Sequence, residues 1–127
     1  MGIFHYYDLD YSEAFIFDEF LVNQIREGIT ITREHNQKLK EVVDTHFKGK
    51  AVVYISNRIN SYAVDPFTYI ETSKIHNLLA IAIVSDNISF RESAAFESKF
   101  YKKPFKIFET LSEAIEWSHK TIQEEMD

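Results

Sequence analysis

Aromatic and β-branched residues dominate the first third of the chain, with short polar stretches between them. Such side chains favour the half-buried surface of a sheet, so we predict two or three antiparallel strands between residues 5 and 27. The acidic stretches 8–10 and 18–19 are the candidate turns. Because either stretch can turn the chain, the register of these strands stays open.

Beyond Gly28 the apolar positions change to helical spacing. One face of the predicted helix contains His35, Leu39, Val42, Val43, His46 and Phe47. Thr32 is the predicted N-cap, because its hydroxyl can accept a hydrogen bond from a backbone N–H of the first turn. Gly49 stands where a glycine often ends a helix.

Three later segments are short and apolar. Residues 51–56 and 78–85 are typical of strands buried on both faces, and residues 105–108 are predicted to form a last short strand. Between the first two, Asp65-Pro66 is predicted to open a short helix that carries Phe67 and Ile70. The chain therefore alternates strands with helices after residue 50.

Two segments have the spacing of a capping box, in which the side chains of the N-cap and N3 residues bond each other's backbone N–H groups. Residues 89–92 precede a helix with Phe96 and Phe100, which Pro104 prevents from continuing. Residues 110–113 precede a final helix. Its predicted inward stripe consists of Leu111, Ala114, Ile115, Ser118 and Ile122.

This order of elements predicts a single α/β domain over residues 1–127. We expect a mixed, mainly parallel sheet of four to six strands, flanked by about four helices and extended by antiparallel N-terminal strands. A chain of 127 residues with 45% hydrophobic residues is large enough to bury a core without disulfides or a structural metal.

Composition narrows the class of protein. The chain has no cysteine, no basic and apolar leader of the secretory type, and no apolar run longer than residues 78–84, so we expect a cytoplasmic protein without a membrane span. A net charge of −6 argues against nucleic-acid binding, because that affinity comes mainly from Lys and Arg side chains that neutralise phosphates.

Three segments of the chain have a distinctive sequence: residues 51–58 (AVVYISNR), 79–86 (LAIAIVSD) and 105–117 (FKIFETLSEAIEW). Together they resemble the SpoIIAA-like group, a bacterial relative of the STAS domain of anti-sigma-factor antagonists. The first half of the chain resembles the group only in its element order. The resemblance implies a STAS-like mixed sheet flanked by helices, and a role in binding proteins or small ligands, lipid included, without an established reaction.

The chain departs from the anti-sigma-factor antagonists in one respect. Those proteins carry a phosphorylatable serine in an Asp-Ser-Ser/Thr-Gly setting after a central strand. The corresponding segment here, residues 56–65, contains Ser56 and Ser61 without that Asp and Gly context. This difference weighs against a partner switch controlled by a kinase.

The loop over residues 56–65 is the main candidate for a binding site, because parallel α/β sheets bind ligands beyond the carboxyl ends of their strands. We expect solvent to reach its side chains and Arg58→Ala to leave the fold nearly intact, with Arg58 and Ser61 as the principal contacts. The alternative is turn chemistry, in which Asn and Ser bond local backbone groups and Asp65 caps a helix. The candidate residues are Ser56, Asn57, Arg58, Asn60, Ser61, Tyr62 and Asp65.

A second candidate is a basic island in an otherwise acidic chain, formed by Lys99, Lys102, Lys103 and Lys106. Such a cluster could contact an anionic lipid surface or an acidic partner. The alternative is that these lysines complement the dipole of a helix and keep a neighbouring strand soluble.

No catalytic or metal-binding pattern occurs in the sequence. The five histidines are dispersed, and the three glycines are too isolated to build a phosphate-binding or dinucleotide-binding loop. We therefore expect no enzyme activity, no cofactor and no metal site. An enzyme of unknown reaction is the least favoured alternative.

These observations predict a non-catalytic binding or regulatory module that acts through protein–protein recognition, with an unidentified protein as its partner. The 11 Phe and 7 Tyr residues keep open the alternative of a protein that binds lipid or another small apolar ligand. An aromatic N-terminal sheet edge also predicts a homodimer, because such edges are usually covered or paired.

Overall fold

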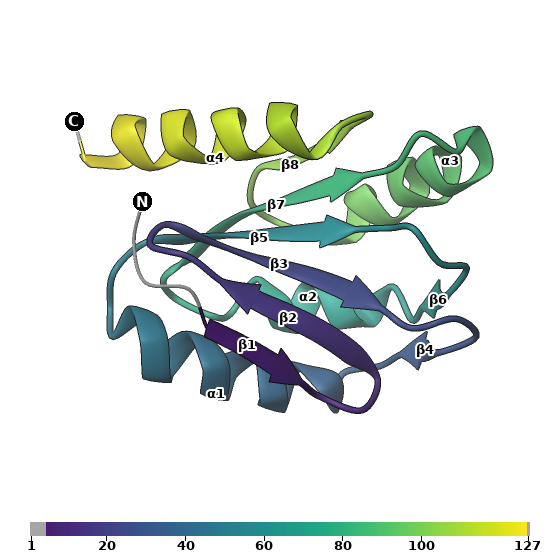
Figure 1. Cartoon of the computed structure of the whole chain (residues 1–127), viewed down its shortest axis with the longest axis horizontal. Coiled ribbons are helices and arrows are strands. Elements are labelled where there is room, and N and C mark those ends of the chain that lie inside the picture. The colour runs from purple at the N-terminus through teal and green to yellow at the C-terminus, as the bar shows by residue number, and fades with distance from the viewer. Residues whose placement is uncertain (1–4, 127) are drawn as a thin grey trace.

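A six-stranded mixed sheet forms the centre of the molecule, which a computed structural model describes for residues 5–126 (Figure 1). The strand order is β1-β2-β3-β5-β7-β8. The bounds are β1 (His5–Asp8), β2 (Ser12–Ile16), β3 (Phe20–Ile25), β5 (Val52–Asn57), β7 (Leu78–Val84) and β8 (Phe105–Phe108). The first three strands pair antiparallel, and β3, β5, β7 and β8 pair parallel. The predicted mixed sheet with antiparallel N-terminal strands is confirmed.

Both predicted turns of the N-terminal third are present. The first contains Asp10, whose φ of 69° lies in the left-handed region that Asp tolerates better than most residues. In the second, the backbone N–H of Phe17 donates to the carbonyl of Phe20 over 3.0 Å. The resulting meander brings β3 beside β5, where Asn23 and Ser56 are partners in the ladder.

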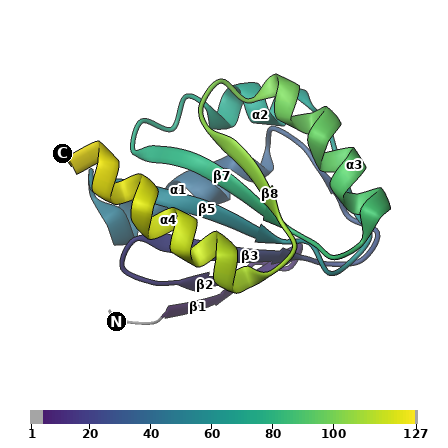
Figure 2. The same ribbon diagram turned by 90° about the horizontal axis from the view of Figure 1, so that it is seen from above.

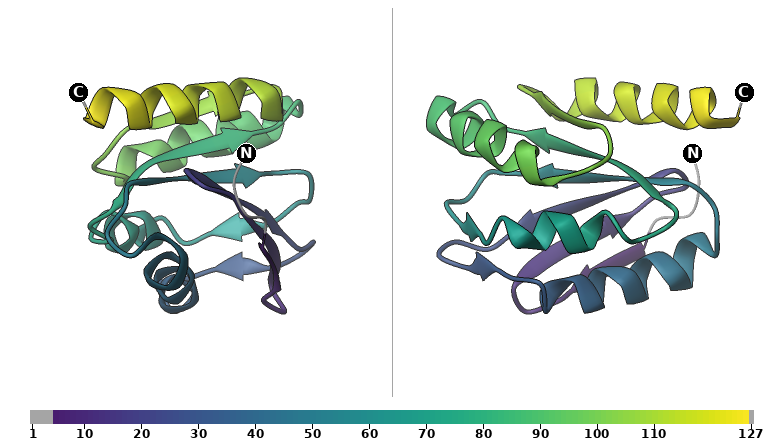
Figure 3. Two further views of the ribbon diagram at one scale, coloured as in Figure 1. Left: turned by 60° about the vertical axis from the view of Figure 1, so that its left-hand side comes forward. Right: turned by 180° about the vertical axis from the view of Figure 1, so that it is seen from behind.

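Helices cover both faces of the sheet, as Figures 2 and 3 show. Helices α1 (His35–Phe47) and α2 (Phe67–Thr72) pack over one face, and α3 (Ile88–Glu97), followed by the short 3-10 helix η1 (Ser98–Phe100), joins the same core through Ala94. Helix α4 (Leu111–Met126) covers the other face, where Ala114 and Ile122 are buried. Strands β5 and β7 contribute to both cores, which explains their nearly continuous apolar sequences.

The helix ends only partly follow the predictions. Thr110 and Glu113 form the expected capping box, since Thr110 N donates to Glu113 Oε1 over 3.2 Å and Glu113 N donates to Thr110 Oγ1 over 3.3 Å. Gly49, with a φ of 85°, follows the end of α1 as predicted. Asp65 Oδ1 accepts a hydrogen bond from the backbone N–H at the start of α2 over 3.1 Å.

Two predicted caps are wrong. Helix α1 begins after Glu34, and the backbone N–H of Thr32 instead donates to His35 Nδ1 over 2.9 Å. The N-cap of helix α3 is Asn87, two residues before the predicted capping box of residues 89–92. The Asn87 side chain accepts a hydrogen bond from Phe90 N over 3.1 Å. Several polar residues near a helix start can serve as caps, so local spacing alone does not choose among them.

A second, two-stranded sheet was not predicted. Strands β4 (Thr30–Ile31) and β6 (Ala63–Val64) pair parallel near the carboxyl ends of β3 and β5 (Figure 1). Ala63 N donates to Ile29 O over 2.9 Å, and Asp65 N donates to Ile31 O over 2.8 Å. This pairing ties the loop that follows β5 to the segment that follows β3.

The capping box at α4 gives a first prediction. Thr110→Ala removes the side chain that accepts from Glu113 N, so the free energy of unfolding should fall by about 1 kcal/mol, measured by urea denaturation. Ser112→Ala, at an exposed position of the same turn, is the matched control and should change it by less than about 0.5 kcal/mol. Equal stability of Thr110→Ala and the wild type would mean that the cap contributes nothing.

Candidate functional site

The loop after β5 does not present Arg58 to solvent. Arg58 is only 3% exposed and Ser56 only 1% exposed, so the expectation that solvent reaches these side chains is wrong. The chain turns after β5 such that the Arg58 side chain enters the space between the loop and α3. There it meets Glu97 at the end of that helix.

Arg58, Glu97 and Tyr69 form a buried polar cluster. Arg58 Nη1 donates to Glu97 Oε1 over 3.0 Å and Nη2 donates to Oε2 over 3.1 Å, which is the two-pronged geometry that a guanidinium and a carboxylate favour. The hydroxyl of Tyr69 donates to Glu97 Oε1 over 2.8 Å. The cluster thus joins three separate segments: the loop after β5, helix α2 and helix α3.

Tyr62 completes the cluster on the loop side. Its carbonyl accepts from Arg58 Nη2 over 3.3 Å, and its ring lies below the guanidinium, 4.3 Å from ring centre to Cζ. Its hydroxyl is 2.8 Å from Ser56 Oγ. Arg58 is therefore held on two sides, by an anion and by an aromatic face.

The two tyrosines of the cluster keep their protons at neutral pH. Burial, followed by the charge of Glu97, raises the pKa of Tyr69 well above its ordinary value. Burial also raises the pKa of Tyr62, although Arg58 and the bond with Ser56 oppose this change. Both phenols are therefore neutral hydrogen-bonding groups rather than ionised bases, and that of Tyr69 donates to Glu97.

The remaining polar residues of the loop bond mainly to segments distant in the chain, and of these bonds only that of Asp65 to a nearby backbone N–H fits the turn-chemistry alternative. Ser61 is exposed, and its backbone N–H donates to Glu27 Oε1 over 2.9 Å. The others are side-chain bonds: Asn57 to Gln24 Oε1 (3.4 Å), Asn60 to Ile25 O (2.9 Å), and Asp65 to Phe67 N (3.1 Å). These bonds fix the loop, and a direct role in recognition stays a prediction for its exposed members.

The basic island does not act as a unit. Lys103 is partly buried, and its ammonium donates to the carbonyls of Ile75 and Leu78 over 2.8 and 2.7 Å, so it ties down the segment before β7. Burial lowers the pKa of this lysine. The side chains of Lys99, Lys102 and Lys106 are exposed.

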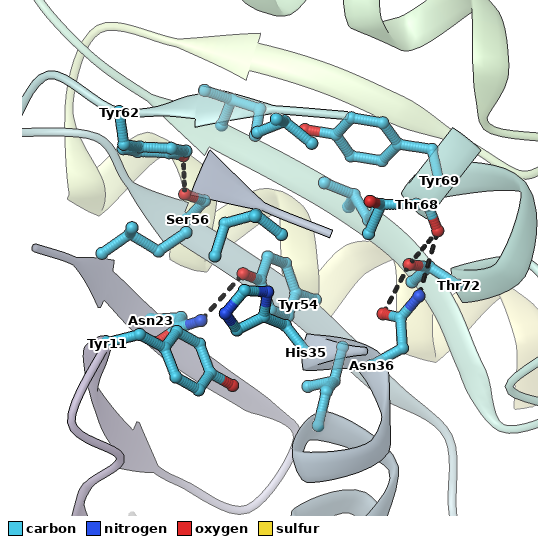
Figure 4. A pocket seen from close by; sticks show the side chains of 16 residues that line it. Tyr11, Asn23, His35, Asn36, Tyr54, Ser56, Tyr62, Thr68, Tyr69 and Thr72 are labelled. Carbon is cyan, nitrogen blue, oxygen red and sulfur yellow. Dashed lines mark hydrogen bonds between the residues drawn. The ribbon is translucent and has the colours of Figure 1, made fainter. Parts of the chain in front are cut away.

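A cavity of about 50 Å³ lies between the sheet and α1 and α2 (Figure 4). Tyr54 lines it and accepts from Asn23 Nδ2 over 2.9 Å, while Asn23 Oδ1 and Thr68 Oγ1 are buried without a partner among residues 5–126. For comparison, an engineered apolar cavity that binds benzene has a volume of roughly 150 Å³. This space therefore has room for a few water molecules but not for a lipid chain.

Aromatic residues instead gather on the surface beside the Arg58 cluster. Phe67 is 59% exposed and Phe96 is 55% exposed. Both rings contact that of Phe100, with centroid distances of 6.3 and 5.7 Å. We call Phe67, Phe96 and Phe100 the aromatic surface. The spacing of Phe96 and Phe100 places them together on one side of their segment, but spacing does not tell which side other elements cover.

A groove of about 500 Å³ adjoins this surface. One wall is formed by residues 62–66 and the other by α3, through Glu92, Ser93 and Phe96, with Arg58 and Glu97 also lining it. Because Arg58 and Glu97 compensate each other, the groove combines an apolar end at Phe96 with a free carboxylate at Glu92. Its chemistry suits a partner that offers apolar and hydrogen-bonding groups.

Neither a metal centre nor a membrane helix is found in the described part of the chain. In residues 5–126, no three His, Asp or Glu side chains converge as metal ligands would. No helix there is both long enough and apolar enough to cross a bilayer.

The buried pair gives a second prediction, which replaces the expectation that Arg58→Ala is harmless. Arg58→Ala leaves Glu97 buried and unpaired, so the free energy of unfolding should fall by about 3 to 5 kcal/mol. Arg58→Met combined with Glu97→Gln removes both charges and keeps an acceptor for Tyr69, so it should recover most of the loss. Thermal and urea unfolding of the single and double variants measure this difference. A double variant no more stable than Arg58→Ala would contradict the assignment of the loss to an uncompensated charge.

Comparisons with known proteins identify the fold. Neither models of known protein families nor curated protein sequences match the chain. A solved structure that is similar is that of an uncharacterized protein from the DUF3478 family of Shewanella loihica PV-4, with a SpoIIAA-like fold. The alignment covers 91% of this chain and 93% of that one, with 15% sequence identity and a TM-score of 0.51. At this identity the likeness defines the fold and not a function. The protein has a SpoIIAA-like fold, as the resemblance of residues 51–58, 79–86 and 105–117 predicts.

Proposed function

We propose that the protein is a non-catalytic binding module that acts through protein–protein recognition, and that the aromatic surface with its adjoining groove is the recognition site. The observation that carries this proposal is the exposure of Phe67 and Phe96, whose rings both contact that of Phe100 and which lie beside a groove. Contiguous apolar side chains on a surface mark interaction sites more often than scattered ones do.

The free energy gained by burying these exposed phenylalanines is large enough to support binding of a partner. Burying a phenylalanine side chain that is exposed in the free protein contributes about 1.5 to 3 kcal/mol. Aromatic side chains that enter the centre of an interface often contribute most of its binding energy. The ammonium of Lys99 lies 5.6 Å from the Phe96 ring, so a charged side chain stands at the rim of the surface.

The buried cluster supports this role by keeping the surface rigid. Arg58, Tyr69 and Glu97 connect the loop, α2 and α3, and the aromatic surface is built on the same two helices and on η1, which directly follows α3. A surface held in one arrangement before binding loses less conformational entropy when the partner docks.

The absence of catalysis is part of the proposal. The buried titratable groups at the groove are committed to each other, since Glu97 accepts from both Arg58 and Tyr69, and the carboxylate of Glu92 lies exposed on α3. The raised pKa of Tyr69 also makes it a poor base or nucleophile at neutral pH.

Partner capture provides the third prediction. Phe96→Ser should leave the fold intact, because the side chain is largely exposed, and should weaken capture of native partners from an extract of the source cells at least about tenfold. Quantitative mass spectrometry of proteins retained on the immobilised wild type and variant measures the change.

Tyr6→Ser is the matched control, because Tyr6 is 47% exposed and lies on β1 at the far edge of the sheet order. It should retain the same partners as the wild type. The proposal would be overturned if Phe96→Ser retained those partners at wild-type levels, or if Tyr6→Ser lost them to the same degree.

A further inference from the structure

We infer that the groove binds an extended peptide segment of a partner protein, which pairs with the free edge of β6 and places a basic side chain opposite Glu92. This inference rests on the proposed recognition function and specifies how the partner is bound. Two observations support it: the unpaired backbone edge of β6 on one wall of the groove, and the uncompensated carboxylate of Glu92 on the other.

The first step concerns the edge of β6. In the described part of the chain β6 pairs with β4 alone, so its second edge has no neighbouring strand. Ala63 N and Asp65 N both bond to the β4 segment. Successive residues of a strand direct their N–H and C=O groups to opposite edges, so those of Val64 are directed away from β4.

The groove lies on that open side. Val64 and Tyr62 both line it, and the carbonyl of Tyr62 bonds to Arg58, which also lines it. The backbone N–H and C=O groups of Tyr62 and Val64 are directed to the same edge, because the two residues are two positions apart in an extended segment. Val64 therefore offers one N–H and one C=O to a chain in the groove, and Pro66, which lacks an N–H, ends the usable edge.

The second step concerns charge. Arg58 and Glu97 form a buried ion pair, so their charges compensate each other. The exposed Glu92 is then the uncompensated charged side chain on the α3 wall, as far as residues 5–126 show. The chain as a whole carries −6. An acidic groove in an acidic protein complements a segment with a lysine or arginine.

The third step sets the spacing of the peptide. Glu92 and Phe96 are four residues apart on α3, which corresponds to a rise of about 6 Å. Two residues of an extended chain span about 6.6 Å, and side chains two apart point to the same side. Side chains of a strand stand perpendicular to its hydrogen bonds, so those that point to solvent would lie beside the exposed side chains of α3: an apolar residue beside Phe96 and, two positions away, a basic residue beside Glu92.

Backbone pairing and side-chain contacts contribute differently to binding of the peptide. One residue of the edge supplies two hydrogen bonds, too few for strong binding, since each contributes only about 0.5 to 1.5 kcal/mol. The apolar contact with Phe96 supplies most of the affinity, and Glu92 selects the basic residue. This combination is the mode in which main-chain bonds orient a peptide and side chains give specificity.

A library of linear peptides displayed on phage, selected against the immobilised wild type, tests the inference. The enriched peptides should share an apolar residue two positions from Lys or Arg. Synthetic versions should bind Glu92→Lys at least about tenfold more weakly by fluorescence anisotropy, and changing their basic residue to Glu should restore binding to that variant.

Glu124→Lys is the matched control, because it makes the same charge change at an exposed position of α4. It should bind like the wild type. Methylation of single backbone nitrogens in the peptide should weaken binding at the one residue that pairs with Val64 and leave its two neighbours nearly unaffected, because only alternate residues face β6.

The inference would be overturned if no peptide were enriched, if Glu92→Lys and Glu124→Lys bound equally well, or if methylation had no positional effect. Loss of native partners in Phe96→Ser together with any of these outcomes would leave the recognition function standing and reject the extended-peptide mode. Unchanged capture by Phe96→Ser would reject both.

Discussion

The carboxyl end of the sheet is organised around the buried ion pair between Arg58 and Glu97. Charged side chains are rarely buried unless they are paired, because each loses its hydration. Here each partner bonds the other in two-pronged geometry and Tyr69 adds a third bond, while Arg58 Nε has no partner among residues 5–126. Neither the loop after β5 nor helix α3 can move away without uncovering a charge, so this pair fixes the position of one wall of the groove relative to the other.

Around this pair the usual distribution of side chains is reversed. The guanidinium and carboxylate lie inside, while Phe67 and Phe96 lie outside. The two cores on the faces of the sheet are built from β5, β7 and the helices that cover them, and they account for most of the buried apolar side chains. The exposed phenylalanines are therefore additional to the packing of the fold, which is why we assign them to recognition.

The small β4-β6 sheet fixes the backbone of the groove wall that lies opposite α3. Its two strands are too short to add much stability on their own. They hold Ala63 and Val64 in an extended conformation, with one edge bonded to the segment after β3 and no strand of residues 5–126 on the other. The aromatic content of the chain is thus explained by packing and by an exposed surface, since the internal cavity has room for only a few water molecules.

Local patterns in the sequence determined the elements. Apolar runs placed β5, β7 and β8, helical spacing placed α1, and the spacing of Thr110 and Glu113 specified the start of α4, because these signals depend on residues close together in the chain. The tertiary structure alone decided which polar and apolar side chains are exposed at the site. Arg58 is buried because of Glu97, which is 39 residues away, and Phe96 is exposed because no element within residues 5–126 covers that side of α3. The strands β4 and β6 are two residues each, too short for a periodic pattern, and form only when the ends of β3 and β5 bring them together.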